Sequence, residues 1–230
     1  MRSKPKRVLV VQNEEASPPG LVREWLEDQD ADVEVLRIDV EDGDIDPRGY
    51  DLIVPLGSEY AAYEEDRPFV QRSRRLLDRA VERDVPVLGV CFGGQLLARV
   101  LGGDAFRAPA SEIGWVTVRS RDQELVAEGP WFQWHFDSFS VPASATLVAE
   151  NDAGPQAYVQ GRHLGVQFHP EVTPEIMDRW VATYRHELDE EGVDPDALLE
   201  ETHRRAGEAR QASLRLLRRY VDTVWPGGDG

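Results

Sequence analysis

The sequence predicts an α/β fold with a mostly parallel central sheet that helices cover on both faces. In roughly the first hundred residues, short apolar strands alternate with amphipathic helices, which is the pattern of a parallel sheet. After Gly103 the segments become shorter strands separated by turns, and these predict an antiparallel or mixed extension of the sheet. From Thr173 onward the chain is predicted to be helical.

Each element in the first half has its own signature. Residues 8–11 form a continuous apolar run, as expected of a short buried strand, and residues 33–38 alternate with period two, as expected of a half-buried one. Residues 21–26 and 67–83 carry apolar side chains at helical spacing. The remaining predicted elements of this half are strands at residues 51–57 and 85–90 and a helix at residues 95–101.

The second half is predicted to contain short strands around residues 115–118, 147–149, 157–159 and 164–168. Thr173 and Asp194 each precede a proline, and an N-cap residue followed by proline predicts the start of a helix. Residues 226–228, a proline and two glycines, are predicted to end the last helix. The apolar stripe predicted to dock that helix on the domain consists of Leu214, Leu217, Val221 and Val224.

The composition excludes several classes of protein. One cysteine in 230 residues excludes an intrachain disulfide and a cysteine-rich zinc site. The 26 basic and 43 acidic residues give a net charge of −17, which opposes binding to nucleic acid and to anionic membranes. No apolar run approaches the roughly 18 residues of a spanning helix. We therefore expect a soluble, cytoplasmic protein.

The most informative segment is residues 89–95, with the sequence GVCFGGQ, which follows a strand and opens a helix. This is the form of a nucleophile elbow with sulfur in place of the serine hydroxyl. Glycines are expected two residues either side of Cys91 because side chains there would collide in a sharp turn. The helix that follows directs its N–H groups and positive dipole end at the thiol, which favours the thiolate. The N–H of Phe92 is then an expected oxyanion donor.

A thiol nucleophile needs a base, and the base needs a group that orients it. His186 and His203 lie among charged residues and are predicted to be solvated. His169 ends an apolar strand, at the rim of the sheet where the elbow also lies, and Glu171 follows two residues later. We therefore predict a catalytic triad of Cys91, His169 and Glu171.

Four segments, in this order, resemble the class I glutamine amidotransferases, and most closely stand-alone proteins similar to the amidotransferase domain of GMP synthetase. They are residues 89–98, residues 112–115 (EIGW), residues 134–137 (WHFD) and residues 165–172 (GVQFHPEV). The resemblance implies a flavodoxin-like three-layer sandwich and the same triad. On this basis we expect an amidotransferase-like domain over residues 1–182. Residues 183–230 are then a C-terminal helical extension packed on it.

The resemblance also implies further site residues. Gly57 is expected to be the second oxyanion donor beside Phe92. Gln95 is expected to contact the substrate, and Trp134, His135, Phe136 and Asp137 to hold its α-amino and α-carboxylate ends. The sequence departs from the family pattern in two places. Residues 56–59 read LGSE where a glycine-rich turn is usual, and Phe136 stands where glycine is common.

The chemistry implied is hydrolysis of the glutamine γ-carboxamide through a thioester, with no metal or organic cofactor. The sequence contains neither a pyrophosphatase loop of the S-G-G-x-D-S kind nor a P-loop, so ammonia is expected to pass to a separate synthase. A free-standing γ-glutamyl peptidase is the principal alternative.

Two alternatives lie outside this chemistry. The first is an esterase resembling dienelactone hydrolase, in which Asp137 or Asp152 would serve with His163 or His169. The second is a catalytically silent binding protein, whose pocket Phe136 would obstruct.

Overall fold

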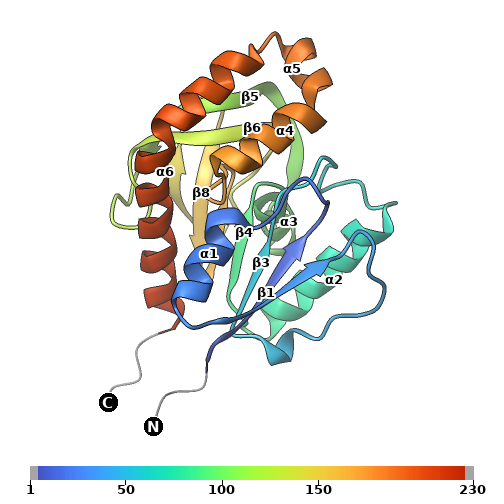
Figure 1. Cartoon of the computed structure of the whole chain (residues 1–230). Helices are drawn as coiled ribbons and strands as arrows, with labels where there is room; N and C mark the ends of the chain where they lie inside the picture. The colour runs from blue at the N-terminus through green and yellow to red at the C-terminus, as the bar shows by residue number, and fades with distance from the viewer. Residues whose placement is uncertain (1–4, 226–230) are drawn as a thin grey trace.

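A single sheet runs through the middle of the molecule, and helices cover both of its faces (Figure 1). The computed structural model describes residues 5–225, and within them the sheet has nine strands in the order β2-β1-β3-β4-β9-β8-β7-β5-β6. The strands are β1 (Arg7–Gln12), β2 (Asp32–Arg37), β3 (Leu52–Pro55), β4 (Val87–Val90), β5 (Ala105–Ser120), β6 (Gly129–Phe139), β7 (Thr146–Glu150), β8 (Pro155–Gln160) and β9 (His163–Val166). The helices are α1 (Gly20–Asp28), the short 3₁₀ helix η1 (Pro47–Gly49), α2 (Pro68–Glu82), α3 (Phe92–Val100), α4 (Pro174–Thr183), α5 (Arg185–Glu191) and α6 (Pro195–Val224).

The half of the sheet from β2 to β9 is parallel and confirms the predicted α/β class. β1 pairs in parallel with β2 and β3, and β4 pairs in parallel with β3 and β9. With β9 as the fifth strand, this is the 2-1-3-4-5 order of flavodoxin-like sheets. Such sheets bind ligands outside the carboxyl ends of their parallel strands, so that edge is the expected place for a site.

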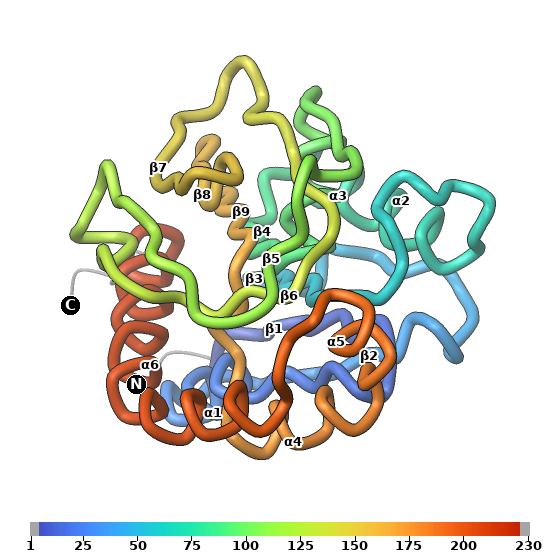
Figure 2. The backbone as a smooth tube through the Cα atoms, turned by 90° about the horizontal axis from the view of Figure 1, so that it is seen from above, coloured from blue at the N-terminus to red at the C-terminus, as the bar shows by residue number. Residues whose placement is uncertain are grey.

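The continuous apolar run of β1 is explained by burial on both faces of the sheet. Val8 and Val10 face the hydrophobic cluster that α1 and α6 cover, whereas Leu9 and Val11 face the cluster that α2 and α3 cover. Seen from above, α1, α4 and α6 lie along one side of the sheet and α2 and α3 along the other (Figure 2). Each fully buried side chain of this size contributes roughly 1.5–3 kcal/mol to folding.

The second half differs from the prediction in the length and number of its strands. β5 covers Ala105–Ser120 instead of residues 115–118, and β6 (Gly129–Phe139) was not predicted as a strand at all. The two pair antiparallel along most of their length. Five successive residues of β6, 131–135, are buried, so the strand lacks the period-two alternation that would reveal it in the sequence. β7 and β8 are antiparallel, as predicted, while residues 163–166 join the parallel half as β9.

Helix α3 begins at Phe92, directly after Cys91, and not at Gln95 as predicted. Gly93 and Gly94 are weak helix formers, so propensity alone places them outside the helix. They lie inside it because the first helical turn passes against the backbones of β3 and β9, where only glycine fits.

Helices α4 and α6 begin at the predicted prolines, and the side chains of Thr173 and Asp194 accept hydrogen bonds from backbone N–H groups of their first turns. α6 packs against α1 and α4. Its buried stripe includes Leu217, Val221 and Val224, as predicted. Leu214, however, is only half-buried, and Leu216 takes the core position. The predicted end of this helix at residues 226–228 lies outside the described residues, as do residues 1–4. None of the helices between residues 5 and 225 has the length and apolar character needed to cross a membrane.

Candidate active site

Cys91 occupies the sharp turn between β4 and α3. Its φ of 51° and ψ of −111° lie in a region that non-glycine residues rarely adopt. A Cβ on Gly89 would lie 2.5 Å from the Gly93 carbonyl oxygen, and one on Gly93 would lie 2.0 Å from the Pro55 carbonyl oxygen. The glycine spacing therefore has the physical reason predicted for a nucleophile elbow, which is the close approach of backbones on either side of the cysteine.

His169 and Glu171 lie just beyond the end of β9 and form a buried pair. The imidazole Nδ1 donates to Glu171 Oε1 at 2.7 Å, and the side chains are 4% and 2% exposed. Backbone contacts fix both residues. The N–H of His169 donates to the Phe132 carbonyl at 2.9 Å, and the Glu171 carbonyl accepts from the N–H of Leu21, at the start of α1, at 3.0 Å.

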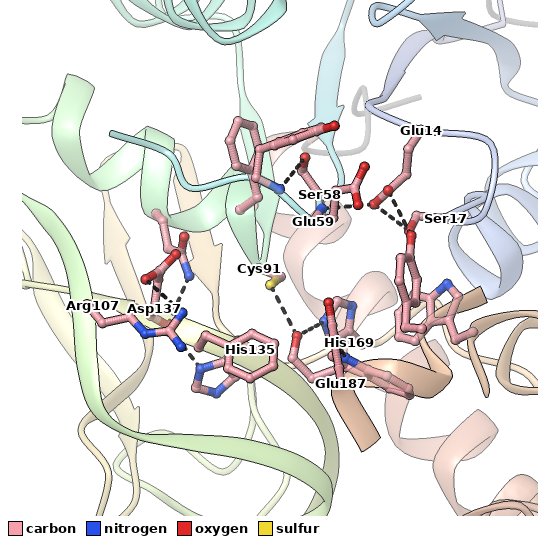
Figure 3. Close-up of a pocket in the computed structure, with 18 residues that line it drawn as sticks. Glu14, Ser17, Ser58, Glu59, Cys91, Arg107, His135, Asp137, His169 and Glu187 are labelled. Atoms are coloured by element: carbon pink, nitrogen blue, oxygen red, sulfur yellow. Dashed lines mark hydrogen bonds and ion pairs between the residues drawn. The ribbon is translucent and has the colours of Figure 1, made fainter. Parts of the chain in front are cut away.

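The sulfur and the imidazole converge on one carbonyl oxygen. Trp134 O lies 3.9 Å from Cys91 Sγ and 3.4 Å from His169 Nε2 (Figure 3). A second group on the sulfur is the side-chain amide of Gln167, whose Nε2 donates to Sγ at 3.6 Å. The structure thus brings together the three residues that were predicted to act together.

The surroundings of His169 favour its protonated form. Burial alone would lower the pKa of the imidazole, but the Glu171 carboxylate and then the Cys91 sulfur outweigh burial and hold this pKa well above its usual value. Both ring nitrogens face oxygen acceptors, which is the arrangement of an imidazolium with two N–H donors.

The two predicted oxyanion donors flank Cys91. Gly57 follows β3, and a Cβ built on it would lie 3.2 Å from His169 Cε1 and 3.8 Å from Cys91 Cβ. Phe92 is the first residue of α3, where helix N–H groups have no partner within the helix. Among residues 5–225, neither the Gly57 N–H nor the Phe92 N–H donates to another protein group.

A cavity opens above Cys91 at the carboxyl edge of the parallel strands, with a volume of about 630 Å³ including its open mouth. All five predicted substrate-binding residues line it: Gln95, Trp134, His135, Phe136 and Asp137. Within this set, the Asp137 carbonyl accepts from Gln95 Nε2 at 3.1 Å and lies 2.9 Å from His135 Nδ1. Burial raises the pKa of the Asp137 carboxyl, while a hydrogen bond from the Tyr63 hydroxyl opposes the shift. Phe136 lies on the wall of the cavity and leaves it open.

Sequence reasoning missed Gln167 as a site residue, although it lies inside one of the quoted segments. Gln167 is fully buried and connects the sulfur to Gln95, because its Oε1 accepts from Gln95 Nε2 at 3.2 Å. Strand periodicity could have found it. Gln167 and His169 are two residues apart at a strand end and therefore point the same way, whereas Phe168 between them packs into the core.

Sequence reasoning also missed the charged residues of the cavity wall. Glu14, Glu59 and Glu187 come from the loops after β1 and β3 and from α5, and Arg107 comes from β5. Burial raises the pKa of both Glu14 and Glu187. These residues belong to segments far apart in the chain, and no local sequence motif indicates that they share a site.

Two residues of the alternative hydrolase site, His163 and Asp152, lie away from the cavity, whereas Asp137 and His169 line it. His163 is at the amino end of β9, beside Val87, whereas Cys91 follows the opposite end of β4. Asp152 is 96% exposed and pairs with Arg119. His186 and His203 are exposed, as predicted. No group of three or more histidine, cysteine, aspartate or glutamate side chains suited to holding a metal ion occurs in the described part of the chain.

Known proteins resemble this chain in sequence and in fold. The sequence matches the family model described as glutamine amidotransferase class-I over residues 13–183. It is 37% identical over 111 residues to the glutamine-hydrolysing GMP synthase of Aeropyrum pernix, covering 42% of this chain and 22% of that protein. It is 32% identical over 134 residues to a shorter relative from Sulfurisphaera tokodaii, which is named as one subunit of a glutamine-hydrolysing GMP synthase, covering 54% of this chain and 69% of that one.

A solved structure extends the likeness to almost the whole chain. The structure of a glutamine amidotransferase from Thermotoga maritima superposes with a TM-score of 0.87 at 32% identity and covers 95% of this chain and 99% of that one. The chain therefore matches a protein of similar extent, while it spans about a quarter of the length of the GMP synthases among its curated relatives, 22% and 27% for two of them.

Proposed function

Because the chain belongs to the class I glutamine amidotransferase family, we propose that it hydrolyses the γ-carboxamide of glutamine through a γ-glutamyl thioester on Cys91. One observation carries the proposal. A cysteine in a strained turn shares a cavity with a buried histidine whose pKa is raised by Glu171 and by the cysteine itself, against the effect of burial. Groups shifted in this way by a specific charge partner, in a cleft, are typical of catalytic sites.

The first half of the reaction forms the thioester. His169 holds the proton of the Cys91 thiol, and the thiolate attacks the carboxamide carbon. The negative charge that develops on the carbonyl oxygen is stabilised by the N–H groups of Gly57 and Phe92, and one such donor is typically worth about 3 kcal/mol. His169 then protonates the nitrogen, the C–N bond breaks, and ammonia leaves.

The second half releases glutamate. His169, now neutral, takes a proton from water, and the resulting hydroxide attacks the thioester carbon. The C–S bond breaks, so glutamate departs and the sulfur returns to the thiolate paired with the imidazolium. Glu171 keeps Nδ1 protonated throughout and so leaves Nε2 free to exchange the proton.

We further propose that the ammonia passes to a separate synthase chain. The support is the similarity to the Sulfurisphaera tokodaii relative, whose name makes it one subunit of a larger enzyme. Two curated GMP synthases are longer chains, and the match covers only 22% and 27% of their length. Co-purification with the tagged chain would identify the synthase that receives the ammonia.

Glutamate release from glutamine by the purified protein tests the proposed hydrolysis, with Cys91→Ala as the control. We expect turnover that the variant abolishes. Turnover that survives the substitution would show that the reaction does not use Cys91.

A second candidate is a γ-glutamyl peptidase, and Phe136 on the cavity wall favours it, because the family pattern commonly has glycine at this position and a phenyl ring reshapes the cavity. Glutathione and a γ-glutamyl dipeptide, offered in the same assay, decide between the two. Turnover of the peptides without turnover of glutamine would make the chain a peptidase.

A further inference from the structure

Most of the charged side chains around the cavity are acidic, and Arg107 is a basic one. Of the described residues that line the cavity, Arg107 alone is a lysine or arginine. The carboxylates of Glu14, Glu59 and Glu187 lie on the far side of Cys91 from Arg107, which shares its side with Asp137 (Figure 3). Within this lining, an anionic group can pair with a guanidinium only at Arg107.

Strand pairing sets Arg107 beside Asp137. The two residues are partners across β5 and β6, and their side chains approach to 4.0 Å between Nη1 and Oδ1. The pairing register shifts between Arg107 and Glu112, so Arg107 is the last residue of β5 in register with β6 before this irregularity.

Phe136, one of the two departures from the family pattern, contacts this arginine. The guanidinium carbon lies 4.8 Å from the centre of the Phe136 ring, at the distance of a cation–π contact. A glycine at this position could not offer such a surface. The phenyl ring therefore acts as a platform that holds a long, largely exposed side chain over the cavity, at 65% exposure.

We propose that Arg107, resting on Phe136, binds the α-carboxylate of the γ-glutamyl group, beside Asp137, which the family resemblance already assigns to this end of the substrate. The proposal rests on the proposed function, because it assumes that a γ-glutamyl compound occupies the cavity. The charges of Arg107 and Asp137 match the zwitterionic end of glutamine. A planar guanidinium can donate two parallel hydrogen bonds to a carboxylate. Arg107 is thus a specificity-determining residue that selects substrates with a free α-carboxylate.

Protection of Cys91 from iodoacetamide tests the proposal without requiring turnover. The alkylation rate at Cys91 is followed by mass spectrometry against increasing L-glutamine, and each variant is compared with its own unprotected rate. We expect Arg107→Ala to raise the glutamine concentration needed for half-protection about tenfold, the effect of one charge-assisted contact. Arg107→Lys and Phe136→Leu should have smaller effects of the same sign.

Two controls separate this role from a general loss of charge or fold. Arg119→Ala removes another half-exposed arginine of β5, which pairs with Asp152 away from the cavity, and should leave protection unchanged. The ligand 4-aminobutanamide, which is glutamine without its α-carboxylate, should protect the wild type and Arg107→Ala equally.

The proposal is overturned if Arg107→Ala leaves protection by glutamine unchanged. It is also overturned if the variant weakens both ligands to the same extent, or if glutamine does not protect the wild type. Protection that depends on Arg107 in a protein without glutaminase activity would uphold this proposal while contradicting the proposed function.

Discussion

Replacing Gly93 with alanine tests the reason for the glycine spacing around the nucleophile. A Cβ at this position would lie 2.0 Å from the Pro55 carbonyl oxygen and 3.0 Å from the Pro55 Cβ. The oxygen belongs to the end of β3, so it cannot rotate away as a side chain could. The two backbones would have to separate by about 1 Å before the contact reached the 3.0 Å below which Cβ atoms are essentially never found.

The expected destabilisation follows from that separation. Overpacking a core typically costs 1–3 kcal/mol, and a clash with backbone should lie at the upper end, about 3 kcal/mol. For a domain of this size, 1 kcal/mol corresponds to roughly 2–4 °C in melting temperature. Gly93→Ala should therefore melt about 6–12 °C below the wild type in a thermal unfolding experiment.

Gly207→Ala is the matched control for the same chemical change. Gly207 lies inside α6 with no atom within 4 Å of a built Cβ, so alanine fits and should add up to about 1 kcal/mol through helix propensity. The two variants should shift the melting temperature in opposite directions.

A second readout connects the clash to the site. Displacement of the first turn of α3 moves Cys91 and the Phe92 N–H, so iodoacetamide should alkylate Cys91 more slowly in Gly93→Ala. A melting temperature equal to that of the wild type, together with unchanged alkylation, would refute the explanation of the glycine spacing.

Two further predictions concern groups around the sulfur. Glu171→Gln removes the carboxylate that raises the pKa of His169, so burial should dominate and the imidazole should become neutral. In the wild type, the pKa of His169 is higher in the folded state than in the unfolded state, so protonation of His169 stabilises the fold. This stabilisation is fully present below the unfolded-state pKa of 6.5 and is lost as the pH rises through the folded-state pKa. The loss of unfolding free energy in urea should therefore be larger at about pH 6 than at high pH, and a loss independent of pH would contradict the assignment. Gln167→Leu removes the hydrogen bond to Cys91 Sγ, and the alkylation rate should fall about tenfold, the effect of one hydrogen bond to a charged group. An unchanged rate would show that Gln167 does not act on the sulfur.

The parts of the fold that could be predicted are those that local physics determines. β1 is a short apolar run because both of its faces are buried. The prolines at positions 174 and 195 mark the starts of helices independently of what those helices pack against. The nucleophile elbow could also be predicted from local sequence, because the close approach of the backbones requires glycine at fixed positions relative to Cys91.

The parts that could not be predicted depend on contacts between distant segments. Both faces of β6 are buried along residues 131–135, because Trp131 packs in the core cluster of the sheet while Phe132 and Trp134 pack against the helices after residue 173, and burial on both faces leaves no periodic pattern in the sequence. Arg107 enters the cavity only because β5 and β6 pair in a register that sets it opposite Asp137. The start of α3 was misplaced because close packing overrides the poor helix propensity of Gly93 and Gly94.

The most direct test of the central claim is covalent labelling with a chloromethyl ketone analogue of glutamine, followed by mass spectrometry of the intact and digested protein. Such a reagent uses the binding of a γ-glutamyl group to deliver an electrophile to the nucleophile. We predict a single adduct on Cys91 that glutamine suppresses and that His169→Ala slows. An adduct on any other residue, or labelling of Cys91 that is indifferent to both glutamine and His169, would contradict the assignment of Cys91 as the nucleophile of a γ-glutamyl site.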